Sequence, residues 1–210
     1  MIHLCLVHSL YCLDKLITDK KIVSQVVNIG PDEEYISINQ LFEKLSNKLK
    51  FNKGAKYFNT TRRGAELIKY ASNAFLATKI TFINELANLC EKANINIEDI
   101  SLGMGSDSRI GSRFLRAGPA YGGSCFPKDT LALVRTAEDH GTDIGIVSEV
   151  VRYNDFRKQS MADRIMASAG GNVAGKTVAV LGLSFKPETD VMRDCPSLDI
   201  LSALVEAGAM

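Results

Sequence analysis

A long stretch without any helix-breaking residue constrains this chain more than any other feature. Residues 65–93, AELIKYASNAFLATKITFINELANLCEKA, contain neither proline nor glycine. Their largely apolar positions follow a helical period and are Leu67, Ala71, Ala74, Phe75, Thr78, Phe82, Leu86, Leu89 and Ala93. Such a helix is roughly 40 Å long and apolar around most of its circumference, so it needs cover on several sides. We predict that it is the spine of a helical domain or of a dimer interface.

The charge balance and the length of the apolar runs exclude two classes of partner. The 210 residues include 25 basic and 24 acidic side chains, a net charge of +1, which gives no reason to expect a nucleic acid. No apolar run reaches the roughly 20 residues of a membrane span. The opening Met1–Lys15 lacks the basic region and the cleavage site of a signal peptide. We therefore expect a cytoplasmic protein that binds neither nucleic acid nor membrane.

The cysteines are odd in number and scattered along the chain. They are Cys5, Cys12, Cys90, Cys125 and Cys195, and no C-x-x-C pair occurs. This pattern disfavours both a disulfide framework and a zinc site. We expect no bound metal, and each cysteine has to be judged by its own surroundings.

Three pieces of the chain differ in their patterns. Residues 1–52 combine a strand-like IVSQVVNIG with a helix-like SINQLFEKLSNKL, which predicts a small α/β piece. Residues 53–170 are mainly helical. There the long helix precedes a short helix and a Gly/Ser/Asp loop in NINIEDISLGMGSDSRIG, a helix in TLALVRTAEDHG and a longer segment, IGIVSEVVRYNDFRKQSMADRIMAS. Gly170-Gly171-Asn172 is typical of a linker.

Residues 171–210 form the third piece. TVAVLGL predicts a buried strand of the parallel type, and SLDILSALVEAGAM predicts a helix. One strand and one helix cannot close a parallel sheet, because each parallel pair needs a second strand reached by a crossover. We therefore expect the truncated start of an α/β, Rossmann-like domain.

One cysteine lies in an unusual setting, in GPAYGGSCFPKDT. Gly122 and Gly123 allow a tight turn and a close approach to a ligand, and Cys125 follows them directly before a predicted helix start. Lys128 supplies a cation and Asp129 a base, which suits a nucleophilic thiolate. The alternative is a buried cysteine in a glycine-rich turn whose charged neighbours are solvated.

Polar residues on the long helix and in the following loop give two weaker hints. Lys69 and Asn73 lie four apart on one helix face and could donate together to a developing oxyanion. Arg109 and Arg113 flank Gly111 in the Ser/Gly/Asp loop and could hold phosphate or sugar oxygens. On the residues alone, simple solvation is the better explanation of Lys69 and Asn73, and it explains the arginine pair equally well.

From about Ala65 to Met210 the chain resembles the UDP-glucose 6-dehydrogenase family. Three long motifs carry the resemblance in the family's order: AELIKYASNAFLATKITFINELANLCE, GMGSDSRIGSRFLRAGPAYGGSCFPKDTLAL and VAVLGLSFKPETDVMRDCPS. The resemblance implies two oxidations of the C6 alcohol of UDP-glucose, with two NAD, to UDP-glucuronate. It implies that Cys125 forms a thiohemiacetal and then a thioester, that Lys69 and Asn73 stabilise the oxyanion and hold water, and that Asp129 assists deprotonation and hydrolysis.

The same resemblance implies further contacts. The residues that match substrate-binding positions are Arg109, Phe114, Arg116, Tyr121, Gly122, Phe185 and Lys186, with Arg109 reaching the substrate of the neighbouring subunit. Lys128 and Arg193 match contacts to NAD. The family's central helical domain implies a homodimer built around the Ala65–Ala93 helix.

Two features depart from the family's pattern. The chain contains no G-x-G-x-x-G phosphate loop, so its activity as an isolated polypeptide is in question. Residues 1–52 instead resemble the C-terminal part of extended short-chain NAD-dependent sugar-nucleotide epimerases and decarboxylases. Two further hypotheses therefore stand beside the dehydrogenase: a non-catalytic dimerising remnant, and an epimerase or decarboxylase fragment.

Overall fold

The structure is a computed structural model that describes residues 60–210. The chain divides into two compact units, Met1–Ile68 and Lys69–Met210, and most of the described residues belong to the second. The α/β piece predicted at residues 1–52, with its resemblance to epimerases and decarboxylases, lies outside the described residues. The domain boundaries predicted at residues 52 and 170 stay predictions.

The long helix is confirmed and is somewhat longer than the sequence pattern predicts. Helix α3 is Arg62–Ala93, 32 residues, or roughly 48 Å at 1.5 Å per residue. Thr61 caps its start, because the hydroxyl of Thr61 accepts a hydrogen bond from the Gly64 amide at 3.1 Å. It ends where Asn94 adopts a left-handed conformation with φ 54°, which is a common way to stop a helix.

Four further helices follow α3 in the described part of the chain. Helix α4 is Ile97–Ser106, with Asn96 as its N-cap, and it continues through the first glycines of the predicted loop. Helix α5 is Phe126–Asp139, and it begins four residues before the predicted TLALV start. Helix α6 is Gly145–Ser168 and α7 is Pro196–Glu206. The predicted mainly α character is therefore confirmed for the described residues.

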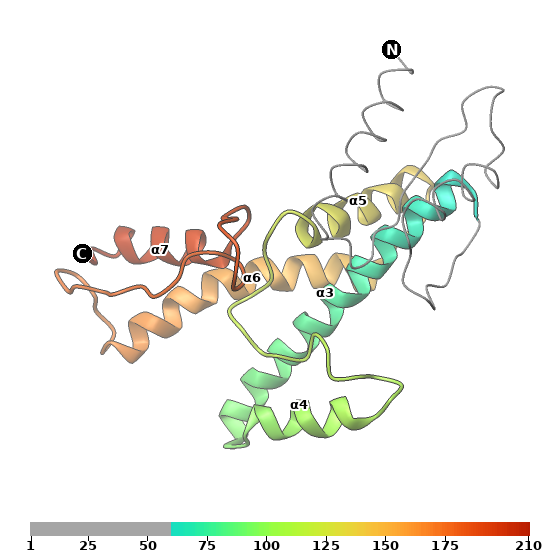
Figure 1. Cartoon of the computed structure of the whole chain (residues 1–210). Helices are drawn as coiled ribbons and strands as arrows, with labels where there is room; N and C mark the ends of the chain where they lie inside the picture. The colour runs from blue at the N-terminus through green and yellow to red at the C-terminus, as the bar shows by residue number, and fades with distance from the viewer. Residues whose placement is uncertain (1–59) are drawn as a thin grey trace, which may run out of the picture. The chain divides into compact units, whose positions relative to one another are not determined.

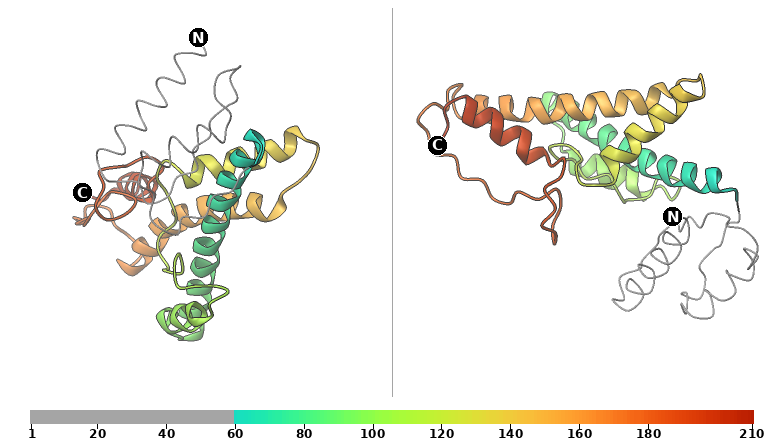
Figure 2. Two further views of the ribbon diagram at one scale, coloured as in Figure 1. Left: turned by 45° about the vertical axis from the view of Figure 1, so that its right-hand side comes forward. Right: turned by 90° about the horizontal axis from the view of Figure 1, so that it is seen from above.

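Helix α6 is the element against which its neighbours pack. Both α5 and α7 contact it, α5 along its first half and α7 along its second half (Figures 1 and 2). Two small apolar clusters join α3 to α6. One contains Ala74, Leu133 and Val147, and the other contains Ala77, Tyr121 and Val150. The second cluster places a residue of the glycine-rich loop, Tyr121, in the core between the two helices.

The strand predicted at TVAVLGL is not borne out. Residues 177–183 form no strand, and the described residues 60–210 contain none. Backbone hydrogen bonds tie the start of this segment to the end of the chain: the Val178 amide donates to the Met210 carbonyl at 2.8 Å, and the Met210 amide donates to the Lys176 carbonyl at 2.9 Å. A strand needs a neighbour along its whole length. The predicted helix after it is confirmed as α7, and the Rossmann-like character of residues 171–210 stays a prediction.

Candidate active site

Cys125 lies at the N-terminus of α5. It is the N-cap residue, and Pro127 occupies the first turn, where its missing amide hydrogen is no loss and its fixed φ suits a helix. The Asp129 amide donates to the Cys125 carbonyl at 2.9 Å, which closes the first turn. The thiol is exposed, whereas the thiols of Cys90 and Cys195 are buried. The exposed sulfur therefore lies at the N-terminal end of a helix.

Asp129 is the centre of a polar cluster that joins α5 to α3. Its side chain is fully buried, 0% exposed, and its Oδ2 accepts a hydrogen bond from Asn73 Nδ2 at 2.6 Å. Lys69 Nζ lies 3.7 Å from the same oxygen, and Lys128 Nζ donates to Oδ1 at 2.6 Å. The four residues predicted at Lys69, Asn73, Lys128 and Asp129 are thus brought together.

The cluster holds Asp129 in its ionised form. Burial raises the pKa of Asp129, but the hydrogen bonds from Lys128 and Asn73 and the positive charge of Lys69 outweigh burial and lower the pKa below its ordinary value. The hydrogen bond to Asp129 raises the pKa of Lys128. A buried carboxylate one helical turn from an exposed thiol therefore stays charged, with two cations beside it.

The glycine turn before Cys125 is covered by the segment before α7. A Cβ atom on Gly122 would meet the Asp194 carbonyl oxygen at 2.3 Å. One on Gly123, whose φ is +87°, would meet the Phe185 ring at 2.8 Å. The Gly123 amide donates to the Arg193 carbonyl at 2.8 Å. Gly122 is therefore required by close backbone contact, and Gly123 by its positive φ and the nearby Phe185 ring. The predicted Phe185 and Arg193 lie against the turn.

Three aromatic rings line up beside the start of α5. The Tyr121 and Phe126 rings meet edge to face with centroids 6.0 Å apart, and the Phe114 ring lies 6.1 Å from that of Phe126. Phe114 has φ 65°, a strained conformation for a bulky residue that is often found at functional sites. Burial raises the pKa of Tyr121 to about 12. Tyr121 therefore stays neutral and serves as a packing and hydrogen-bonding group.

The remaining predicted residues lie in more open surroundings. The Arg109 guanidinium forms a two-pronged ion pair with Asp107 of its own loop, with Nη2 and Oδ2 2.6 Å apart, and it is 87% exposed. Lys186 Nζ lies 5.3 Å from the centre of the Phe185 ring. Arg116 is exposed and follows the buried Leu115. The roles predicted for these three cations stay predictions.

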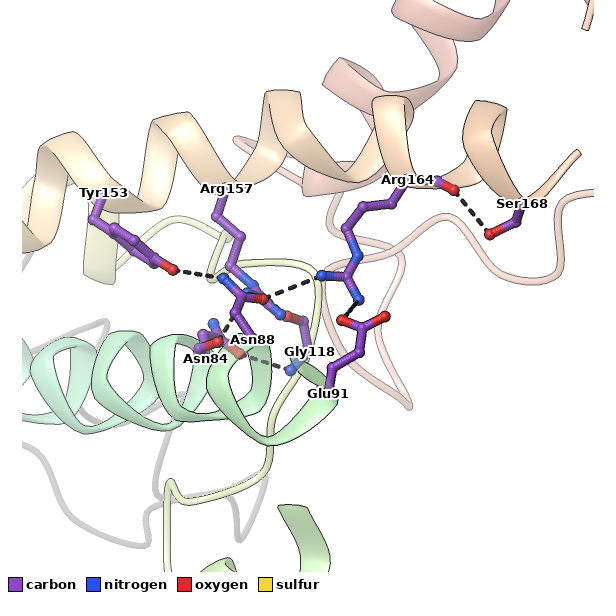
Figure 3. A network of polar contacts seen from close by, with 8 residues as sticks. All are labelled: Asn84, Asn88, Glu91, Gly118, Tyr153, Arg157, Arg164 and Ser168. Atoms are coloured by element: carbon purple, nitrogen blue, oxygen red, sulfur yellow. Dashed lines mark hydrogen bonds and ion pairs between the residues drawn. The ribbon is translucent and has the colours of Figure 1, made fainter. Parts of the chain in front are cut away.

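Sequence reasoning missed the side chains that hold the glycine-rich loop. Asn84 of α3 and Arg157 of α6 both bind Gly118 (Figure 3): the Gly118 amide donates to Asn84 Oδ1 at 2.8 Å, and Arg157 Nε donates to the Gly118 carbonyl at 2.8 Å. Asn154 of α6 binds Tyr121 in the same way. The Tyr121 amide donates to Asn154 Oδ1 at 2.9 Å, and Asn154 Nδ2 donates to the Tyr121 carbonyl at 3.1 Å.

A signal for these residues is present in the sequence. Asn84 continues the buried stripe of Ala74, Ala77 and Thr81 on α3. Asn154 and Arg157 continue the stripe of Val147 and Val150 on α6. A polar residue in phase with a buried apolar stripe has to find hydrogen-bond partners inside the fold, and the backbone of an irregular loop offers them.

The described part of the chain offers neither a membrane-spanning helix nor a cluster of metal ligands. None of the helices at residues 60–210 combines the length and the apolar character needed to cross a membrane. No group of three or more His, Cys, Asp or Glu side chains within these residues is placed to hold a metal ion.

Comparison with known proteins identifies the domain that carries this site. Residues 63–156 match the UDP-glucose/GDP-mannose dehydrogenase family, central domain. This range begins just inside α3 and ends within α6, so it includes Lys69, Asn73, Cys125 and Asp129.

The relatives that match are longer than this chain. The UDP-glucose 6-dehydrogenase of Rhizobium meliloti (strain 1021) is 54% identical over 181 residues, which are 86% of this chain and 41% of that protein. UDP-glucose 6-dehydrogenase YwqF of Bacillus subtilis (strain 168) is 53% identical over 72% of this chain and 34% of its own length. A solved UDP-glucose dehydrogenase from Pyrobaculum islandicum has a TM-score of 0.74 and 37% identity, covering 81% of this chain and 39% of that one. The chain thus spans about 40% of the length of such relatives.

The alignment with the Rhizobium meliloti protein is longer than residues 53–210, and therefore includes part of residues 1–52. The resemblance of that piece to epimerases and decarboxylases stays a prediction.

Proposed function

We propose that this chain, whose residues 63–156 match the central domain of the UDP-glucose/GDP-mannose dehydrogenase family, serves an NAD-dependent UDP-glucose 6-dehydrogenase. The observation that carries the proposal is the buried Asp129, which joins Lys69 and Asn73 of α3 to the helix that Cys125 begins. High identity to two UDP-glucose 6-dehydrogenases supports the choice of substrate.

In the proposed reaction Cys125 is the covalent catalyst. Its thiolate adds to the C6 aldehyde left by the first oxidation and forms a thiohemiacetal, and the second oxidation converts this adduct to a thioester that water hydrolyses. Lys69 and Asn73 donate to the oxygen that becomes negatively charged. Asp129, kept ionised by the hydrogen bonds from Lys128 and Asn73 and by the charge of Lys69, accepts protons during deprotonation and hydrolysis.

Residues around the turn would hold the two ligands. Tyr121, Gly122, Phe114, Arg116, Phe185 and Lys186 are proposed to contact UDP-glucose, with Arg109 reaching the substrate of a second subunit. Lys128 and Arg193 would hold NAD, and their positive charge suits its phosphates: Lys128 lies three residues after Cys125, and the Arg193 carbonyl binds the turn before it. When bound, NAD supplies the hydride acceptor for both oxidations.

A cytoplasmic location is part of the proposal. The exposed thiol of Cys125 has to stay reduced in order to act as a nucleophile, and the cytoplasm keeps thiols reduced.

Calorimetry with UDP-glucose tests this function. We expect measurable binding by the unmutated chain, and we expect Lys69→Ala to weaken it by about tenfold because an oxyanion or hydroxyl donor is lost. Lys92→Ala is the matched control, since it removes an exposed lysine from the last turn of the same helix. Absence of binding by a folded, dimeric chain would contradict the proposal and would leave the dimerising scaffold as the remaining function.

The homodimer is proposed from an uncovered face of α3. Phe75, Phe82 and Leu89 recur every seven residues and are 66%, 47% and 61% exposed. Beside them a groove of about 410 Å³ runs between α3 and α6, lined by Phe82, Ile146 and Tyr153 among others. Burying this face against a second copy would remove a continuous apolar surface from water.

A further inference from the structure

The loop between α4 and α5 is held by side chains instead of by a sheet or helix. Both backbone groups of Gly118 are bound, the amide by Asn84 and the carbonyl by Arg157. Both backbone groups of Tyr121 are bound by the single carboxamide of Asn154. Three side chains thus satisfy four main-chain groups within four residues of loop.

These three side chains are deeply buried. Asn84 is 1% exposed, Asn154 is 3% and Arg157 is 5%. Arg157 also donates from Nη1 to the Asn84 carbonyl and to Asn88 Oδ1, both at 3.0 Å, and burial lowers its pKa. Keeping a guanidinium in such a place is costly unless its donors are used. Here the donors face carbonyl and amide oxygens of α3 and the loop (Figure 3).

The helices that supply these anchors also supply the proposed catalytic groups. Asn73 and Asn84 are eleven residues apart on α3, close to three full turns, so both lie on the same face roughly 16 Å from each other. Asn73 bonds Asp129 at one point of that face, and Asn84 bonds the loop at another. The loop then runs only four residues from Tyr121 to Cys125.

We infer that Asn154, together with Asn84 and Arg157, is a positioning residue for Cys125: it fixes the backbone at Tyr121 so that the Gly122–Cys125 turn is delivered to the donors on α3. This inference rests on the proposed function, because it assigns these side chains to the geometry of that site. None of the three touches the reacting atoms.

The variant that tests it is Asn154→Leu, which keeps the branching and the number of side-chain heavy atoms and removes both bonds to Tyr121. Asn88→Ala is the matched control, because Asn88 joins α3 to Tyr153 and to Arg157 and Arg164 without contacting the loop. Three quantities are measured on each variant of the 210-residue chain. They are hydrogen exchange at the Tyr121 amide, UDP-glucose affinity by calorimetry, and the rate at which iodoacetamide alkylates Cys125, located by mass spectrometry.

We expect Asn154→Leu to speed exchange at Tyr121 and to weaken UDP-glucose binding by about tenfold or more, the effect of leaving buried polar groups without partners. Asn88→Ala should leave the affinity unchanged even where it lowers thermal stability. Equal affinities of Asn154→Leu and the unmutated chain would overturn the inference. Should Asn154→Leu fail to fold, Arg157→Lys decides by the same measurements, since lysine cannot reproduce the several bonds of the guanidinium.

A failure of the proposed function has a separate signature. If the unmutated chain does not bind UDP-glucose, the alkylation rate of Cys125 alone decides the positioning role. A change of about threefold or more in Asn154→Leu, with none in Asn88→Ala, supports it, because thiol reactivity follows the local surroundings of the sulfur. Equal rates in all three proteins would overturn it.

Discussion

Among single residues, Asp129 is fully buried, and each of its carboxylate oxygens has a hydrogen-bond partner. Its two carboxylate oxygens face Asn73, Lys69 and Lys128, and it lies in the first turn of α5, where helix amides favour a negative charge. A buried carboxylate without such partners would be neutral. The cluster therefore fixes both the charge of Asp129 and the spacing between α3 and α5.

We predict that Asp129→Asn lowers the free energy of unfolding at pH 7 by about 1.5–3 kcal/mol, the usual worth of hydrogen bonds to a charged group. The pKa of Asp129 is lowered in the folded protein. Its contribution to the free energy of unfolding is therefore complete above about pH 4, the ordinary aspartate pKa, and is lost as the pH falls through the lower pKa of the folded protein. Urea unfolding at pH 7 and near pH 3 checks this. The difference in free energy of unfolding between Asp129→Asn and the unmutated chain should be smaller near pH 3 than at pH 7.

Asp139→Asn is the control for that measurement, because Asp139 is an exposed aspartate at the other end of α5. Its effect should stay within about 0.5 kcal/mol at either pH. A gap between Asp129→Asn and the unmutated chain that is constant with pH would contradict the predicted role of the charge.

Gly122 gives a second prediction at this scale. A methyl group there would meet the Asp194 carbonyl oxygen at 2.3 Å, so Gly122→Ala should lower the free energy of unfolding by about 1–3 kcal/mol, as overpacking does. Gly118→Ala is the matched control in the same loop. A Cβ atom on Gly118 meets nothing within 4 Å, and its φ is not positive. Equal stabilities of the two variants, measured by urea unfolding, would show that the contact at Gly122 is not tight.

At the scale of elements, the helices could be predicted from the sequence and the expected strand could not. The periodicity of α3 is a local property, and its capping by Thr61 and Asn94 is local as well. The β-favouring side chains of residues 177–183 predict a strand, but a strand exists only where a neighbour pairs with it. Within residues 60–210 only the last residues of the chain approach this segment by backbone hydrogen bonds.

The candidate site shows the same division between local and distant information. The approach of Asp129 to Lys69 and Asn73 joins residues 56 or more positions apart, and only the resemblance to a family brought them together in advance. The hydrogen bonds from Asn154 and Arg157 to the backbone of the glycine-rich loop were missed because a polar residue in a helix is usually solvated. Its phase with Val147 and Val150 becomes informative only when the buried face of α6 is known.

At the scale of the whole molecule, the exposed apolar face of α3 concerns assembly. We predict that light scattering reports twice the mass of one chain, and that Leu89→Glu, which places a charge on this face, yields monomers. Leu131→Glu is the matched control, since Leu131 is 55% exposed on α5, compared with 61% for Leu89 on α3. A monomeric unmutated chain, or a dimer that survives Leu89→Glu unchanged, would contradict the proposed interface.

Helix α3 carries the proposed oxyanion donors, the anchor of the glycine-rich loop and the stripe of Phe75, Phe82 and Leu89. Close-packed protein interiors transmit strain, so a shift of α3 at one contact is passed to its other contacts. In a pair of chains joined along α3, substrate that draws Lys69 and Asn73 toward it in one copy would therefore shift the same donors in the other copy. Saturation by the nucleotide sugar would then depart from a simple hyperbola, and the two centres would act cooperatively.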